Sequence, residues 1–418
     1  MDKMYQYIDS KRDLTIELQK LLTEYVAINP ESDGDGEYNK YIALKEFIKN
    51  WGFDSISNID IPDERVSSKI RPVLIATIDG KVKENLWIIT HLDVVPPGEL
   101  SLWNTPPYKA TVIGDKIYGR GTEDNQQGIV SSLIAAKYFL DNNIIPYYTV
   151  KLMFVPAEET GSGYGLEWLV SNRIELFGKD DLIITPDVGD PEGVNIEVAE
   201  KSILWITFKV LGKQSHGSRP DNGINAVRAT SYLAVSLDSL YEKFNKKDDF
   251  FDVPYSTFEP TKRIGSITSN MNTISGEEIL GLDCRVLPDY NLKDLLNEID
   301  IIKKSIEEKF KVKITTTIEQ DLQASPPTKT TEKVVILLKD SIKKVTGKNA
   351  KFIGIGGGTV AAFFRKKDIP VSLWSTVDNT MHSPNEYSSI NNTLKDAKVF
   401  AVMMLNEGKI NEGKINNE

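Results

Sequence analysis

The chain has 418 residues, of which 40% are hydrophobic and 26% charged, and its formal net charge is −10 at pH 7. This length predicts two domains, and the acidic balance argues against DNA or RNA as the main partner, because nucleic-acid binding usually requires a basic face. The single cysteine excludes an intrachain disulfide and favours a cytoplasmic protein. We expect no signal peptide and no membrane partner, since no apolar run approaches the length of a membrane span.

Strand-like and helix-like patterns alternate through the first part of the chain. A helix is expected over 14–26, and then strands over 73–78 and 86–89, a helix over 129–140, and strands over 149–155 and 182–185. Alternation of this kind is typical of an α/β domain, doubly wound around a mostly parallel sheet that is covered on both faces.

The pattern changes near residue 198. The next elements expected are a strand over 203–211, a helix over 224–244, strands over 264–269 and 278–287, a helix over 292–310 and a strand over 311–318. This β-α-β-β-α-β order predicts a small α+β domain of ferredoxin-like plan.

Alternation of helices and strands resumes after a proline-containing linker. The expected elements are helices over 331–345, 361–366 and 393–405, with strands over 351–353 and 371–375. The sequence therefore predicts a catalytic domain formed by 1–197 and 322–418, and an inserted lid or dimerisation domain formed by 198–321.

Candidate metal ligands follow the predicted strands of the large domain. His91 and Asp93 follow the strand at 86–89, and the remaining candidates are Glu158 and Glu159 after 149–155, Asp187 after 182–185, and His382 after 371–375. Because the carboxyl ends of parallel strands meet at one edge of a sheet, we expect these groups to lie together. Asp124, in a glycine-rich loop before a helix, can reach the same edge. Imidazole and carboxylate groups in this arrangement predict a two-metal hydrolytic site.

Each candidate also has an ordinary interpretation when taken alone. Asp124 could cap the helix that follows it, Asp187 could belong to a turn, and the Glu158-Glu159 pair could lie in a solvated loop. Their coincidence at strand ends favours the metal site.

Seven features of the chain together resemble one family of enzymes. They are Asp187 and the segments 90–96, 118–124, 157–162, 215–217, 356–359 and 382–386. The set resembles the co-catalytic zinc metallohydrolases and metallopeptidases, which include aminoacylase, acetylornithine deacetylase, succinyl-diaminopimelate desuccinylase, glutamate carboxypeptidases and dipeptidases. The resemblance covers nearly the whole chain and includes an inserted lid.

The resemblance implies two divalent metal ions per subunit, with zinc expected first and cobalt as the alternative, since both suit nitrogen and oxygen ligands. Asp124 would bridge the ions; His91 and Asp187 would complete one site, and Glu159 and His382 the other. The family's reaction would be cleavage of an amide bond in an N-acyl amino acid or short peptide by a hydroxide that bridges the metals.

Three further residues match positions that act in the family's reaction. Glu158 would be the general base that takes a proton from the water and returns it to the leaving amine. Asp93 would orient His91. His216, in the lid, would stabilise the oxyanion, often from the other subunit, so the resemblance also implies a homodimer that forms through the lid.

Weaker matches concern substrate contacts. Asn272 and Arg285 match lid positions that bind substrate, and the turn of Gly357, Gly358 and Thr359 could hold a carboxylate with its backbone N–H groups. Arg285 could equally be an ion-paired strand residue.

The chain departs from the family pattern at two points. The loop after Asp124 has one residue more before its glycine than the common Asp-x-Lys-Gly pattern. Thr359 is followed by apolar residues where desuccinylases usually have an aspartate and an arginine. The first departure leaves the substrate subclass open, and the second argues against diaminopimelate as the substrate.

Two other functions fit parts of the sequence. A relative that binds ligands without catalysis would usually lack a metal ligand or the base, and here all are present. A dinucleotide-binding oxidoreductase is suggested by the glycines at 354–358 after a strand, but Thr359 stands at the third glycine position of that fingerprint.

Overall fold

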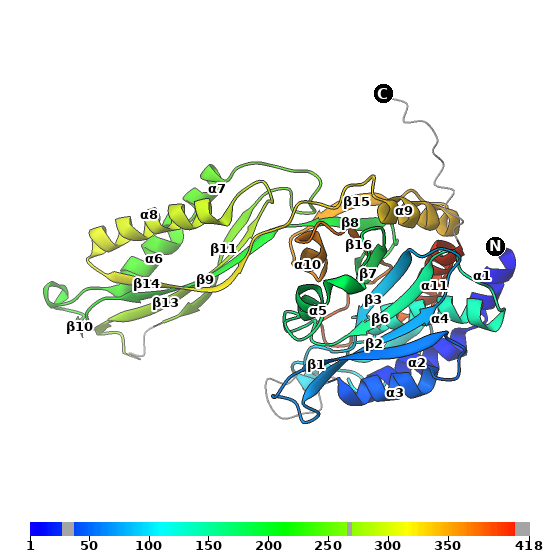
Figure 1. Cartoon of the computed structure of the whole chain (residues 1–418). Helices are drawn as coiled ribbons and strands as arrows, with labels where there is room; N and C mark the ends of the chain where they lie inside the picture. The colour runs from blue at the N-terminus through cyan, green and yellow to red at the C-terminus, as the bar shows by residue number, and fades with distance from the viewer. Residues whose placement is uncertain (27–36, 266–269, 406–418) are drawn as a thin grey trace. The chain divides into compact units, whose positions relative to one another are not determined.

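The computed structural model describes residues 1–26, 37–265 and 270–405. The chain divides into two compact units (Figure 1). We call Met1–Val198 with Thr328–Phe352 and Phe363–Glu418 the large unit, and Ala199–Pro327 with Ile353–Ala362 the small unit. The sequence-based division had assigned 322–327 and 353–362 to the large domain.

An eight-stranded sheet forms the centre of the large unit (Figure 1). Its spatial order is β1 (Ser55–Pro62), β2 (Ile70–Ile78), β6 (Thr149–Val155), β3 (Asn85–His91), β7 (Leu182–Gly189), β16 (Val371–Ser375), β8 (Asn195–Glu200) and β15 (Lys351–Ile355). Strands β6, β3, β7 and β16 run parallel, whereas β1, β2 and β8 pair antiparallel with their neighbours. The predicted α/β class with a mostly parallel sheet is therefore confirmed.

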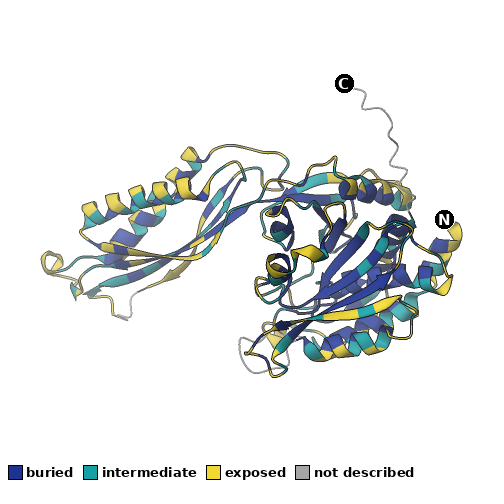
Figure 2. Cartoon of the chain, in the orientation of Figure 1, coloured by how far each residue is buried: buried dark blue, intermediate teal, exposed yellow. Residues whose placement is uncertain are grey.

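The central strands are buried because helices cover them. Every residue of β3 after Asn85 is buried, which matches the continuous apolar run in the sequence and is typical of a parallel sheet (Figure 2). Contacts to the sheet come from α3 (Tyr38–Ile48), α4 (Gln126–Asp141) and α9 (Lys333–Thr346), while α11 (Ile390–Leu405) packs on α4 and α9. The other α-helices described in this unit are α1 (Asp2–Asp9), α2 (Arg12–Glu24) and α5 (Leu166–Asn172), while α10 (Ala361–Arg365) begins in the small unit and ends in the large one.

A second, smaller sheet joins two distant segments of the large unit. Its strands are β4 (Thr111–Ile113), β5 (Lys116–Tyr118) and β17 (Tyr387–Ser389), and β5 pairs antiparallel with β17. The pairing places the segment before Asp124 beside the segment after His382. These short strands were not predicted from the sequence.

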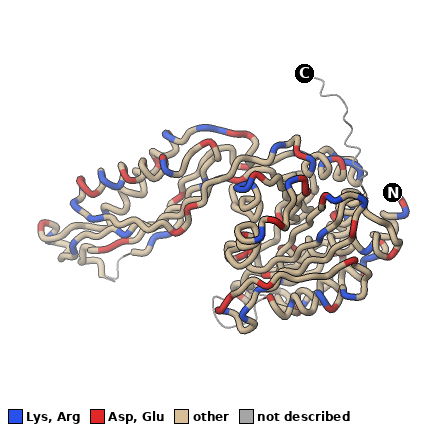
Figure 3. The backbone as a smooth tube through the Cα atoms, in the orientation of Figure 1, with Lys and Arg blue, Asp and Glu red and all other residues tan. Residues whose placement is uncertain are grey.

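The small unit has a four-stranded antiparallel sheet in the order β11 (Thr257–Ile264), β13 (Glu277–Val286), β9 (Ser202–Leu211) and β14 (Lys313–Leu322). Helices α6 (Ala226–Ser236) and α8 (Leu292–Phe310) share an apolar core with this sheet. Acidic and basic residues are interspersed along α8 (Figure 3). The strand order agrees with the ferredoxin-like plan.

Two expectations for the small unit were wrong in detail. The helix expected over 224–244 is broken into α6 and α7 (Ser239–Lys243), where the Ser239 hydroxyl donates to the carbonyl of Ser236 and competes with helical bonding. The strand expected over 264–269 lies earlier, as β11, and residues 266–269 are outside the described residues. Six of the eight residues of this edge strand are exposed, so it shows no alternating pattern.

Across the described ranges, none of the helices is long and apolar enough to cross a membrane.

Candidate metal centre

The large unit brings together all five predicted metal ligands. His91 ends β3, Asp187 lies on the neighbouring β7, and Glu159 follows β6. Asp124 precedes α4, and His382 lies in the loop between β16 and β17. The three parallel strands therefore deliver their ligands to one edge of the sheet, and the two loops complete the cluster.

The first group of ligands consists of His91, Asp124 and Asp187. His91 Nε2 lies 2.9 Å from Asp124 Oδ1 and 3.5 Å from Asp187 Oδ1. His91 is buried, and the two carboxylates are largely shielded from solvent. The side chain of Asn125 donates to Asp187 Oδ1 over 3.1 Å and holds that carboxylate in place.

The second group consists of Asp124, Glu159 and His382. His382 Nε2 lies 3.0 Å from Asp124 Oδ2 and 3.2 Å from Glu159 Oε1. The two oxygens of Asp124 thus face different histidines, so this carboxylate is common to both groups.

The contacts of His91 require a positive charge at its Nε2. His91 Nδ1 donates to the carbonyl of Asp93 over 3.0 Å, which leaves the Nε2 lone pair directed at two carboxylates. A proton or a metal ion must neutralise this arrangement. Ligand atoms about 2 Å from a tetrahedral zinc ion lie roughly 3.3 Å apart. The N···O distances of 2.9–3.5 Å fit such a cation.

The pKa values express the same need for positive charge. Hydrogen bonds that His382 donates to the carboxylates of Asp124 and Glu159 raise its pKa to about 10. Burial by itself would lower the pKa of His91, but the surrounding carboxylates hold it well above its ordinary value. Burial opposes ionisation of Asp124, yet its contacts with His382 and His91 keep the pKa of this carboxyl low.

Asp93 acts mainly on the loop that carries the two glutamates. Its carboxylate accepts the backbone N–H groups of Glu158 and Glu159, each over 3.0 Å. Its Oδ1 is 3.5 Å from His91 Nδ1, so the nearer partner of that nitrogen is the Asp93 carbonyl. Asp93 therefore supports both His91 and the Glu158-Glu159 pair.

Glu158 and the adjacent Glu159 both have pKa values raised by burial, and at Glu159 a hydrogen bond to His382 opposes the shift. Burial raises the pKa of Glu158 well above its ordinary value, and the neighbouring Asp187 raises it further. A carboxylate whose proton affinity is raised in this way is suited to accept and return a proton near neutral pH.

A buried ion pair behind the site was not predicted. Arg71 donates to both oxygens of Glu37 at 2.9 Å, and Glu37 Oε1 accepts the N–H of Ala157, next to Glu158. Ala157 has a positive φ of 60°. A non-glycine residue in this conformation needs such support. Glu37 lies in a polar stretch with no strand or motif beside it, so the sequence carried no signal for its role.

The small unit brings His216 and Asn272 together. Their segments pair as the short strands β10 (Ser215–His216) and β12 (Thr273–Ile274), and the N–H of Gly217 donates to the Asn272 carbonyl. Ser218 donates its N–H over 3.2 Å to His216 Nδ1. His216 Nε2 therefore carries the proton and, since this histidine is exposed, can donate outward.

Two of the other predicted substrate contacts, Arg285 and Thr359, already have partners within the small unit. The Arg285 guanidinium forms a two-pronged ion pair with Asp283, at 2.7 and 3.0 Å, and donates to the Gly356 carbonyl. The N–H of Thr359 donates to the Glu200 carboxylate over 2.6 Å. The Glu200 carboxylate therefore occupies the N–H of Thr359, which was one of the donors expected to bind substrate.

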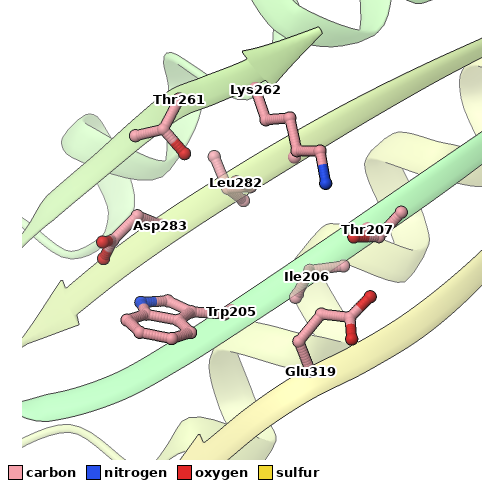
Figure 4. A pocket seen from close by; sticks show the side chains of 9 residues that line it. Trp205, Ile206, Thr207, Thr261, Lys262, Leu282, Asp283 and Glu319 are labelled. Atoms are coloured by element: carbon pink, nitrogen blue, oxygen red, sulfur yellow. The ribbon is translucent and has the colours of Figure 1, made fainter. Parts of the chain in front are cut away.

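A pocket of about 480 Å³ lies on the sheet of the small unit (Figure 4). Its lining includes Trp205, Lys262, Asp283 and Glu319. Because Asp283 is also the ion-pair partner of Arg285, the pocket borders this arginine.

Comparison with known proteins agrees with this geometry. Residues 87–406 match the model of the family described as peptidase family M20/M25/M40. The chain belongs to this family. It is therefore a metal-binding hydrolase that acts on amide or peptide bonds, and the clustered histidines and carboxylates are the candidate ligands.

Individual proteins are similar over nearly their whole length. An uncharacterized metallohydrolase of Methanococcus maripaludis is 43% identical over 93% of this chain and 98% of its own. A succinyl-diaminopimelate desuccinylase of Wolbachia pipientis is 26% identical over 92% and 91%. The crystal structure of human carnosine dipeptidase 1 superposes with a TM-score of 0.71 at 18% identity, over 97% of this chain and 98% of that one.

Proposed function

We propose that this protein binds two divalent metal ions, zinc first and cobalt as the alternative, and cleaves the amide bond of an N-acyl amino acid or short peptide. The observation that carries the proposal is the pair of ligand groups that share Asp124. A carboxylate with one oxygen in each group suits a bridging ligand, with His91 and Asp187 on one ion and Glu159 and His382 on the other.

Metal ions bound there would lower the pKa of a coordinated water and polarise the scissile carbonyl. Glu158 would accept the proton of the attacking water and deliver it to the leaving nitrogen, for which its raised pKa is suited. Asp93 would hold Glu158 in place through the backbone, since its carboxylate accepts the Glu158 N–H over 3.0 Å.

His216 would stabilise the negative charge that develops on the carbonyl oxygen. Its Nε2–H is available because Nδ1 accepts from Ser218. Asn272, which lies beside it, would contact the same substrate. A preorganised donor of this kind contributes roughly 10²–10³ in rate.

The small unit also supports a homodimer. Val227, Tyr232 and Val235 are exposed along one face of α6, and Ile264 is exposed at the end of β11. Arg263 donates to Ser231 on α6, so the helix face and this edge strand adjoin. Apolar side chains exposed together on a helix face and at the adjoining strand end are suited to contact a second copy.

The Gly-rich turn does not support a dinucleotide-binding oxidoreductase. The Glu200 carboxylate accepts the N–H of Thr359, which is where a pyrophosphate would need a donor. A second anion at this place would be repelled.

The experiment that tests the proposal measures amine release from N-acetyl amino acids, N-succinyl amino acids and dipeptides. Protein stripped with a chelator is compared with the same protein after addition of zinc or cobalt. We expect release only with metal, and the best substrate identifies the acyl or peptide class. If metal-loaded protein with two ions per chain releases no amine from any compound, the proposed activity is wrong.

A further inference from the structure

Two buried carboxylates that are not metal ligands lie in the loops that supply the ligands. Glu123 immediately precedes Asp124, and Glu386 lies four residues after His382. They are only 3% and 1% exposed. Burial raises the pKa of Glu386 to about 7 and also raises the pKa of Glu123, so both groups are costly to keep charged unless donors surround them.

Glu123 bonds to the loop that carries His382. Its Oε1 accepts the N–H of Asp378 over 2.6 Å. Its Oε2 accepts the N–H groups of Thr380 and Met381, and the hydroxyl of Thr380 over 2.9 Å. Met381 directly precedes His382, so these bonds set the start of the ligand-bearing turn.

Glu386 bonds in the opposite direction, to the loop that carries Asp124. Its Oε1 accepts the N–H groups of Glu123 and Asp124 over 3.0 and 3.1 Å. Its Oε2 accepts the N–H of Gly121 over 2.9 Å and the guanidinium of Arg120 over 2.5 Å. Each loop thus contributes the carboxylate that fixes the other.

The loop at 379–385 needs external support. Asn379, His382 and Asn385 have φ values of 60°, 60° and 63°, which L residues rarely adopt. Such conformations persist only where the surroundings determine them. Glu123 supplies contacts immediately before His382, and Asn385 is itself held by its side-chain bond to the Leu102 carbonyl.

We propose that Glu123 and Glu386 are positioning residues that hold the Asp124 and His382 loops against each other. The carboxylate of Asp124 is thereby kept within reach of both ligand groups. This inference rests on the proposed metal centre. The two glutamates keep Asp124 Oδ2 at 3.0 Å from His382 Nε2 while Oδ1 lies 2.9 Å from His91 Nε2. Both carboxylate oxygens of Glu123, and both of Glu386, accept hydrogen bonds. Glutamine cannot replace either glutamate, because the NH₂ group of glutamine would face N–H donors.

A matched control exists at the opposite end of β3. Asp181 is a buried carboxylate that accepts the N–H groups of Asn85 and Gly178 and the side chains of Asn85 and Trp87. The strand that starts at Asn85 ends at His91, about 20 Å away. Asp181→Asn therefore removes a similar set of bonds without touching either ligand loop.

The test begins with the metal-free protein. Hydrogen exchange measured by mass spectrometry should show the amides at 378–381 exchanging at least tenfold faster in Glu123→Gln than in wild type. Glu386→Gln should accelerate the amides at 121–124 instead, and Asp181→Asn should accelerate neither segment. Zinc affinity, measured by competition with a chelator, should fall about 10- to 100-fold in both glutamine variants and stay at the wild-type value in Asp181→Asn.

Two results would overturn the inference. One is unchanged exchange at 378–381 in Glu123→Gln. The other is a loss of zinc affinity in Asp181→Asn as large as in the glutamine variants, since it would mean that affinity follows global stability. Failure of the wild-type protein to bind zinc would instead contradict the proposed metal centre. The exchange measurement, which uses metal-free protein, would still test whether the two glutamates hold the loops.

Discussion

Binding of metal at this centre must release protons, because both ligand histidines are in the protonated, positively charged form when no metal is bound. The pKa of His382 is raised to about 10 by Asp124 and Glu159, and that of His91 lies well above its ordinary value. At pH ~7.5 both histidines are therefore mostly in the positively charged form, with a proton on each ring nitrogen. Metal ligation requires the neutral imidazole, so filling both groups should release about two protons per chain.

The sign of the pH dependence follows from the direction of these shifts. A raised pKa in the folded, metal-free protein stabilises that state fully below the unfolded histidine value near pH ~6.5. For His382 this contribution is lost as the pH rises through about 10. Metal competes with the proton, so apparent affinity should rise about tenfold per pH unit for each proton released.

The assay is isothermal titration calorimetry of zinc into chelator-stripped protein at pH ~7.5, in buffers of different ionisation enthalpy. The dependence of the observed heat on the buffer gives the number of protons released. His382→Ala should release about one proton fewer. His216→Ala should release the wild-type number, because His216 lies in neither ligand group. Heats that do not depend on the buffer would refute the charge argument.

Further predictions concern catalysis, stability and assembly. Glu158→Gln should lower kcat by roughly 10²–10⁴ while two metals stay bound, as metal analysis of the purified variant would show. His216→Ala should lower kcat about 10²–10³-fold without changing metal content, and equal loss of metal would contradict its assignment to the oxyanion. Glu386→Ala leaves Arg120 buried and unpaired and should cost about 3–5 kcal/mol of unfolding free energy in urea. Val235→Glu should convert the proposed dimer to a monomer in light scattering, and a wild-type monomer would contradict the dimer proposal.

The parts of the fold that could be predicted from sequence are those that local patterns determine. Strands β6 and β16 and helix α8 have the predicted bounds because their apolar runs or helical spacing are continuous. The five candidate ligands were found because each follows a strand or a glycine-rich loop, and parallel strands deliver such residues to one edge.

Features that depend on distant partners could not be predicted in this way. Glu123 contacts residues more than 250 positions away, and no local pattern marks a carboxylate that accepts such donors. The edge strand β11 lacks an alternating pattern because most of its residues are exposed. The pairing of Arg285 with Asp283 was within reach, since residues two apart on a strand share one face.

The most direct test of the account counts bound metal ions and released amine on the same sample. Chelator-stripped protein is titrated with zinc, and amine release from the best substrate is plotted against the metal bound per chain. We expect activity to require metal and to be complete at two ions per chain, with Glu158→Gln binding both ions but losing activity. Full activity in Glu158→Gln, or complete activity without bound metal, would contradict the two-metal mechanism.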